Sequence, residues 1–343
     1  MNLQDVTINQ HFVPQVEQRL NAINPSAKNE NQKIYSFSLI DREASSIRLD
    51  SEKGFKISNT LSLSDLFSFD VLDKEATRYN FEKLFSPYEV NIKSNTESLI
   101  SKLTCPNADV KSEIFNIFLA KFINFVRNPY SIQEILKTFA SLKNVYPTNP
   151  IHYKNFVRVL NGRKPHQSYL CEQLNISEEE YRDWLAIIFL LLTSFEENQP
   201  NFLEQMIKEL YEDPERYIGV MIYTYDDKTC LLSDRGYSIP SPENKHMIWD
   251  FNLYSHGFIR YAFSDLEAVT RKGTSQHIVE KYKASPKSIK VYHESNDLSA
   301  LEQYNRHVVY QCYKNVFNSS SECYGIYPHI VLSFSTPYQY FAI

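Results

Sequence analysis

The chain is poor in glycine, with 7 glycines among 343 residues. Glycine serves tight turns, bulges and phosphate-cradling loops, so this scarcity favours a helix-rich structure. Neither a GxGxxG nor a GxxxxGK[ST] motif occurs. The sequence therefore argues against the Rossmann and P-loop classes of nucleotide-binding protein.

Cysteine is sparse as well, and the five cysteines are widely spaced with no CxxC pair and no Cys/His cluster. This spacing argues against a structural zinc site or a disulfide framework, and reduced thiols of the cytoplasm are the simpler interpretation. The most apolar run, residues 184–192, is too short to cross a bilayer. The first residues have no basic or apolar signal region. We expect a cytoplasmic protein without membrane contact.

Charge of one sign does not dominate either. The net charge of −5 gives no global attraction to nucleic acid, although local basic patches can still exist. A hydrophobic content of 43% and a charged content of 22% are typical of a globular protein with ample core. No long low-complexity linker divides the chain, so we predict a single domain over residues 1–343.

Helix signals fill the middle of the chain, from about residue 61 to 213. S-x-x-E capping boxes begin at Ser86, Ser131 and Ser177, and a fourth at Ser299 predicts a helix running to about Phe317. A phenylalanine-rich helix after Asp109 must end before an Asn-Pro pair at residues 128–129. An Asn-Gly pair at residues 161–162 marks another helix end.

Strand signals lie on both sides of this helical block. Residues 34–40 alternate between apolar and polar, and residues 217–225 and 229–232 read as a hairpin. Further strands are expected at residues 258–263, 289–292 and 330–334. The predicted fold is α+β, with a helix-rich N-terminal and middle part and a mainly antiparallel sheet built largely from the C-terminal third. An extended segment over residues 1–59 would pack on both other parts.

Five short motifs occur in a recognisable order. They are HFVPQ from His11, YNFEKLFSPYE, RNP after the phenylalanine-rich helix, LLSD, and YNRHVVYQCYKNVFNSS. This order resembles the bacterial domain-of-unknown-function family 4238, over roughly residues 11–320. The resemblance implies candidate positions at His11, Pro14, Gln15, Glu82, Glu89, Arg127, Pro129, Ser233, Asp234 and Asn305. It implies no reaction. The chain departs from the family pattern after Gln15 and after Asp234, where Arg235 and Gly236 replace an Asn-Pro pair.

Two of these positions have a structural and a chemical interpretation of comparable weight. His11 can lock the N-terminal segment through hydrogen bonds, or it can act as a general base or metal ligand. Asp234 fits a turn, yet a carboxylate at the end of a strand is also rigidly aimed. We expect these two side chains to be partners.

The other positions carry the same kind of alternative. Glu89 completes a capping box, and on a continuous helix it would share a face with Glu82, seven residues earlier. Arg127 can satisfy the end of its helix or clamp a phosphate or carboxylate. Asn305 lies in an apolar helical stripe, where a structural hydrogen bond is expected. Gln15, Glu82, Ser233 and Asn305 are taken as supporting residues.

Two basic stretches stand out against the acidic whole. Arg163 and Lys164 lie in one, and Arg271 and Lys272 lie in the other. Such stretches are commonly solvated faces, but they can also contact nucleic acid.

Together these features suggest a hydrolase or nuclease-like enzyme acting on phosphoesters of nucleic acid or nucleotides. His11 would be the base, Arg127 would stabilise developing charge, and Glu89 and Asp234 could hold a divalent metal ion. A toxin or phage-defence setting is suggested by analogy alone. The alternative is a non-catalytic binding or sensor protein whose motifs are structural.

Overall fold

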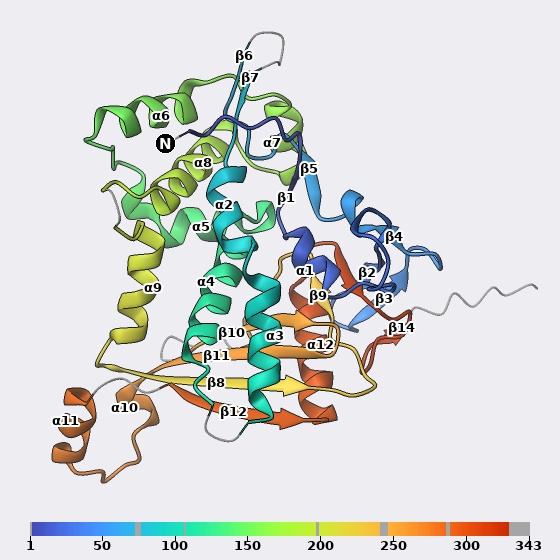
Figure 1. The fold of residues 1–343 in the computed structure, drawn as a ribbon, viewed down its shortest axis with the longest axis vertical. Helices are drawn as coiled ribbons and strands as arrows, with labels where there is room; N and C mark the ends of the chain where they lie inside the picture. The colour runs from blue at the N-terminus through green and yellow to red at the C-terminus, as the bar shows by residue number, and fades with distance from the viewer. Residues whose placement is uncertain are drawn as a thin grey trace, which may run out of the picture.

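The structure is a computed structural model that describes residues 2–72, 77–105, 108–196, 199–240, 246–285 and 289–328. It is an α+β protein with 43% helix and 22% strand. Helices occupy one half of the molecule and cover a face of a C-terminal sheet in the other half (Figure 1). The predicted strand at residues 330–334 lies outside the described residues.

Eight of the α-helices in the described residues follow one another without a strand between residues 82 and 212, and strands separate these eight from the other helices. They are α1 (Gln15–Arg19), α2 (Glu82–Glu89), α3 (Ile92–Leu103), α4 (Lys111–Arg127), α5 (Ile132–Thr138), α6 (Pro150–Asn161), α7 (Gln167–Leu174), α8 (Glu178–Leu192), α9 (Phe202–Glu212), α10 (Leu266–Val269), α11 (Gln276–Ala284) and α12 (Leu298–Gln311).

In the part of the chain that the structure describes, the strands group into two larger sheets and two strand pairs. They are β1 (Asn9–His11), β2 (Lys33–Asp41), β3 (Ser46–Leu49), β4 (Phe55–Lys56), β5 (Ser62–Ser64), β6 (Asp70–Leu72), β7 (Thr77–Tyr79), β8 (Arg216–Thr224), β9 (Leu232–Ser233), β10 (His246–Tyr254), β11 (Gly257–Asp265), β12 (Lys290–Ser295), β13 (Asn315–Asn318) and β14 (Tyr327–Pro328).

The C-terminal sheet has the order β10-β11-β8-β12. Its first three strands are antiparallel, but β12 pairs with β8 in parallel, so the sheet is mixed. Helix α4 packs on it, because the Phe118 ring meets Phe251, Tyr261 and Phe263 with ring centroids 4.8–6.1 Å apart. The phenylalanine stripe predicted from the sequence is thus the contact between the helical layer and the sheet.

The second sheet joins the two ends of the chain. Its order is β14-β3-β2-β13-β9, with β4 paired to β2. The predicted strand at residues 34–40 is confirmed as β2, and its antiparallel neighbour β13 comes from residues 315–318. This sheet was not expected, since pairing across such a distance in sequence leaves no local pattern.

The predicted hairpin at residues 217–232 is wrong. Strand β8 forms as expected, but its neighbours are β11 and β12, and β9 belongs to the second sheet. Asn305 of α12 explains the departure. Its side-chain oxygen accepts the N–H of Leu231 at 3.0 Å, and its amide donates to the carbonyl of Thr229 at 3.4 Å. A helix side chain therefore satisfies backbone groups that a strand partner would otherwise bind.

Of the four predicted capping boxes, only the one at Ser177 is confirmed. Ser177 caps α8 with the reciprocal Glu180 bond, as predicted. Ser86 lies inside α2, and the hydroxyl of Ser131 bonds to the Tyr237 hydroxyl at 2.7 Å. Asp297, two residues before Ser299, caps α12 by accepting the Ala300 N–H. Helix α4 does end before the Asn-Pro pair, and α6 ends at Asn161, as the sequence indicated.

Within the described residues, no helix combines the length and the apolar character that crossing a membrane would require.

Candidate functional site

The HFVPQ motif forms a corner between a strand and a helix. His11 ends β1, which pairs antiparallel with β5, and Pro14 precedes the first turn of α1. The side chains of Phe12 and Val13 are buried in the core, which anchors the corner. His11 and Gln15 are thereby held four residues apart, on the same side of the chain.

A chain of hydrogen bonds runs through the His11 ring. Its Nδ1 lies 3.0 Å from the Thr60 carbonyl oxygen, which can only accept, so Nδ1 carries the proton. The Gln15 amide then donates to Nε2 at 2.8 Å, and Arg19 donates to the Gln15 side-chain oxygen. Burial is the main reason that the His11 pKa falls to about 4. The ring is therefore neutral near pH 7 and orients Gln15, which orients Arg19.

Helix α2 supplies the acidic side of the site. Glu82 stands in its first turn and Glu89 at its end, seven residues apart and hence on one face. The predicted shared face is realised although Pro87 lies within the helix.

Arg127, at the end of α4, contacts this acidic face of α2 through Glu89. Its guanidinium donates to Glu89 at 2.5 Å and lies over the Phe85 ring, with Cζ 4.9 Å from the ring centroid. Arg127 is only 1% exposed. The guanidinium thus satisfies a neighbouring carboxylate rather than the last carbonyls of its own helix.

These elements enclose a cleft of about 390 Å³. We call it the polar cleft, because the side chains in its wall that carry chemistry are His11, Gln15, Arg19, Glu82 and Glu89. Two separate stretches of the chain line it, residues 7–19 and residues 82–90, and Arg127 of α4 contacts the cleft through its bond to Glu89. The structure therefore brings together His11, Glu89 and Arg127, together with the supporting residues Gln15 and Glu82.

Three buried polar atoms at the polar cleft have no hydrogen-bond partner within the described part of the chain. They are Arg19 Nε, Glu82 Oε1 and Arg127 Nε. Burial raises the Glu82 pKa to about 7, opposed by the positive charge of Arg127 and reinforced by Glu89. A carboxyl group that titrates near neutrality and faces a cleft is a group suited to proton transfer.

Asp234 has a different environment, and the expected pairing with His11 is wrong. Its carboxylate accepts the backbone N–H groups of Tyr313, Lys314 and Asn315 at 2.7–2.9 Å. It is 3% exposed, and burial raises its pKa against these three bonds. Asp234 therefore fixes the turn that leads from α12 into β13. This role agrees in part with the interpretation of Asp234 as a turn residue.

Ser233 and Asn305 also lie in the C-terminal half. The Ser233 hydroxyl accepts the Arg235 N–H at 2.9 Å, and Gly236 adopts a φ of +75°, a value that favours glycine. Asn305 holds residues 229–231 as described above. Neither Ser233 nor Asn305 is among the described residues that line the polar cleft.

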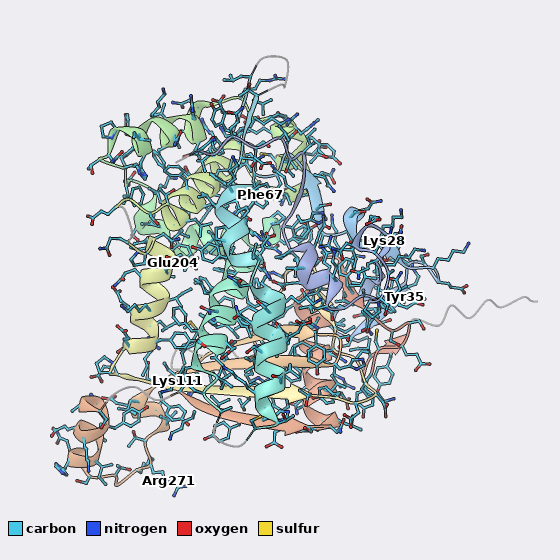
Figure 2. All side chains as sticks on the ribbon, viewed as in Figure 1. Lys28, Tyr35, Phe67, Lys111, Glu204 and Arg271 are labelled. Carbon is cyan, nitrogen blue, oxygen red and sulfur yellow. The ribbon has the colours of Figure 1, made fainter. Side chains whose placement is uncertain are left out.

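The two basic stretches differ in exposure. Lys164 is 8% exposed and its ammonium group donates to the carbonyls of Leu160 and Gly162 at the end of α6. It does not present its charge to a partner, which corrects the predicted contact. Arg163, the residue before it, is exposed. Arg271 and Lys272 are exposed. Figure 2 shows Arg271 on the segment that carries α10 and α11, which projects from the sheet.

The predicted metal pair of Glu89 and Asp234 is not assembled, because Glu89 binds Arg127 and Asp234 binds backbone. Among the residues that the structure describes, no group of three or more His, Cys, Asp or Glu side chains could hold a metal ion.

Two features of the site were missed from the sequence. Arg19 was outside the candidate set, although it lies four residues after Gln15 on the same helix face. Beneath the site, Lys121 and Asn124 of α4 donate to the two oxygens of the buried Glu17 at 2.6 and 2.7 Å. The spacing 121, 124 and 127 on one apolar helix was the available signal, since polar residues three apart share a face.

Comparison with models of protein families, with curated proteins and with solved structures found no match to this chain. The family resemblance of the motifs therefore stays a prediction.

Proposed function

We propose that the polar cleft binds and hydrolyses phosphoesters, with Glu82 as the group that moves the proton. The observation that carries this proposal is the half-buried Glu82 carboxyl, whose Oε1 has no bond to any described residue and which lines the cleft beside Arg19. Guanidinium groups suit phosphate oxygens, because their N–H groups match the oxyanion geometry.

The proton transfer is assigned to Glu82 rather than to His11 for an electrostatic reason. With a pKa near 4 and an N–H donor already on Nε2, the His11 imidazole is a weak base. Glu82, with a pKa of about 7, is half ionised at neutral pH and can both take and give a proton. His11 then acts as a positioning residue for Gln15 and Arg19.

Water and the Glu82 carboxyl account for every proton and bond in the proposed hydrolysis. The Glu82 carboxylate takes a proton from water as the water oxygen bonds to phosphorus. The bond from phosphorus to the leaving oxygen breaks, and Glu82 returns the proton to that oxygen. Arg19 stabilises the charge that develops on the phosphoryl oxygens, and Arg127 keeps Glu89 in place as its counter-charge.

The proposal is tested by following hydrolysis of bis(p-nitrophenyl) phosphate and of a single-stranded oligonucleotide, with Mg²⁺ and with EDTA in parallel. We expect Glu82→Gln to lower kcat by about 10²- to 10⁴-fold, the range for general acid–base catalysis. Glu212→Gln, on the exposed side of α9, is the matched control. Turnover by Glu82→Gln equal to that of the wild type, with both proteins folded, contradicts the proposal.

The alternative function is binding without catalysis. It is favoured by one observation, that both His11 ring nitrogens and the Glu89–Arg127 pair are already satisfied by protein groups. A binding protein would retain affinity for a phosphoester in the polar cleft but show no turnover, so the same assay separates the two functions.

A further inference from the structure

A second hollow adjoins the polar cleft. It is a cavity of about 570 Å³ between α1 and α3, which lie side by side (Figure 1). Val16 and Arg19 line both hollows, so the cavity and the polar cleft meet at these two side chains of α1. A ligand whose charged group lies at Arg19 can therefore extend into either one.

The cavity wall is mainly apolar and includes one aromatic ring. Val16 comes from α1, Leu20 directly follows it, Ile100 comes from α3, and the Tyr254 ring comes from the end of β10. The rim carries opposite charges, since Lys93 and Glu97 pair across one helical turn at 3.7 Å. An enclosure of this size and composition suits a small organic ring system.

The cavity wall also contains two buried polar side-chain atoms that could bond to a ligand. Thr96 is 2% exposed and Gln32 is 6% exposed. The Thr96 hydroxyl and the Gln32 side-chain oxygen find no hydrogen-bond partner among the residues that the structure describes. Gln32 is held in a fixed orientation, because its amide donates to the carbonyls of Pro25 and Ala27 at 2.8 and 3.1 Å. Its oxygen is therefore a preset acceptor that lacks a donor in the described chain.

We propose that the substrate is a nucleotide whose base enters this cavity while its phosphoester occupies the polar cleft. The inference rests on the proposed function and names its substrate class. A nucleobase offers a planar face for Tyr254 and Ile100, and its amino or imino N–H groups can donate to the Gln32 oxygen and to the Thr96 hydroxyl. Arg19, at the junction, binds the phosphate.

An acyl chain is the competing occupant, because the wall is largely apolar. It would fill the volume but leave the Thr96 hydroxyl and the Gln32 oxygen buried without partners, which is unfavourable. A site built with hydrogen-bonding groups rejects a ligand that lacks the matching donors far more strongly than an apolar site rejects a polar one. The observations therefore favour a base over a lipid tail.

Binding to the full-length protein tests the proposal. Calorimetry would compare AMP, GMP, CMP and UMP with ribose 5-phosphate, which has no base, and with octyl phosphate. We expect at least one nucleotide to bind about tenfold or more tightly than ribose 5-phosphate. Equal affinities for all nucleotides and ribose 5-phosphate overturn the base site, and tightest binding of octyl phosphate assigns the cavity to an apolar tail instead.

Two variants locate the base. Thr96→Val keeps the shape of the side chain and removes its hydroxyl, and we expect it to weaken nucleotide binding about fivefold or more while ribose 5-phosphate binds as before. Ile100→Trp fills the cavity and should abolish the preference for nucleotides. Thr104→Val, at the exposed end of α3, is the matched control. Unchanged nucleotide affinity in both folded cavity variants would contradict the proposal.

The outcome also separates this inference from the proposed function. Nucleotide binding that depends on Thr96 but leads to no hydrolysis leaves the base site standing and removes the enzyme. Hydrolysis of simple diesters without any preference for nucleotides would support the enzyme and rule out the base site.

Discussion

His11 is ordered near the start of the chain by bonds on both ring nitrogens, to the Thr60 carbonyl and to Gln15. Burial is the largest cause of the lowered His11 pKa of about 4 and outweighs the Thr60 bond, which raises the pKa, so the imidazole is neutral near pH 7. The same ring that organises the polar cleft is therefore a point at which acid weakens the fold.

The pH dependence of stability measures this effect. The ordinary pKa of 6.5 holds in the unfolded chain, so between pH 6.5 and 4 the unfolded state takes up a proton that the folded ring does not. The contribution of neutral His11 is present above pH 6.5 and is lost as the pH falls toward 4, by up to about 3 kcal/mol. We expect His11→Gln to flatten the fall in the free energy of unfolding, measured by urea denaturation from pH 7.5 to 4.5.

His277→Gln is the control for this series, since His277 is exposed on α11. It should retain the wild-type profile. A His11→Gln profile parallel to that of the wild type would show that the ring does not set the acid sensitivity.

At the scale of elements, the short helix α1 depends on α4 for its place. Glu17 and Lys121 are each 1% exposed and pair at 2.6 Å, and Asn124 binds the second Glu17 oxygen. Charges so deeply buried are tolerated only as a bonded pair. The pair thus ties the helix that carries Gln15 and Arg19 to the helix that ends in Arg127.

A double-mutant cycle tests this tie. Lys121→Met alone leaves the Glu17 charge buried without its cation, and we expect a loss of about 3–5 kcal/mol in the free energy of unfolding. Glu17→Gln with Lys121→Met removes both charges and should lose clearly less than the sum of the single variants. Denaturant unfolding of the four proteins gives the coupling, and additive losses would show that the two side chains do not act as a pair.

Prediction of these elements from sequence succeeded where the signal was local. The Ser177 capping box and the end of α4 before Pro129 depend on residues within one turn of each other, and both are confirmed. Ser86 carries the same S-x-x-E pattern yet lies within α2, because helix α2 already begins at Glu82. A local motif therefore marks a helix start only when no earlier start competes with it.

At the scale of the whole molecule, both sheets depend on contacts between distant parts of the chain. Strand β2 lies between β3 and β13. Its pairing with β13 joins parts of the chain more than 250 residues apart, since Asn315 lies opposite Ser38. Helix α4 packs on β10 and β11 through Phe118. Either half alone would therefore expose to water the surface that the other half buries in the whole protein.

A fragment experiment tests this dependence. Residues 1–213, which end before β8, should show no cooperative thermal transition, because β2 loses β13 and α4 loses its sheet. Mixing them with residues 214–343 should restore a single transition, followed by circular dichroism. Cooperative unfolding of residues 1–213 alone would mean that the chain contains two independent domains rather than the single predicted one.

The sequence by itself determined the α+β class, the helical block and strand β2, because periodicity, proline and capping act over a few residues. The resemblance of its ordered motifs to a known family implied His11, Gln15, Glu82, Glu89 and Arg127 as candidates. Only the tertiary structure decided which of them meet. It placed Asp234 on the backbone of residues 313–315, away from His11, and it brought Arg19 and the Thr96 cavity to the site. Hydrogen bonding and burial between distant segments set these positions, and no local pattern encodes them.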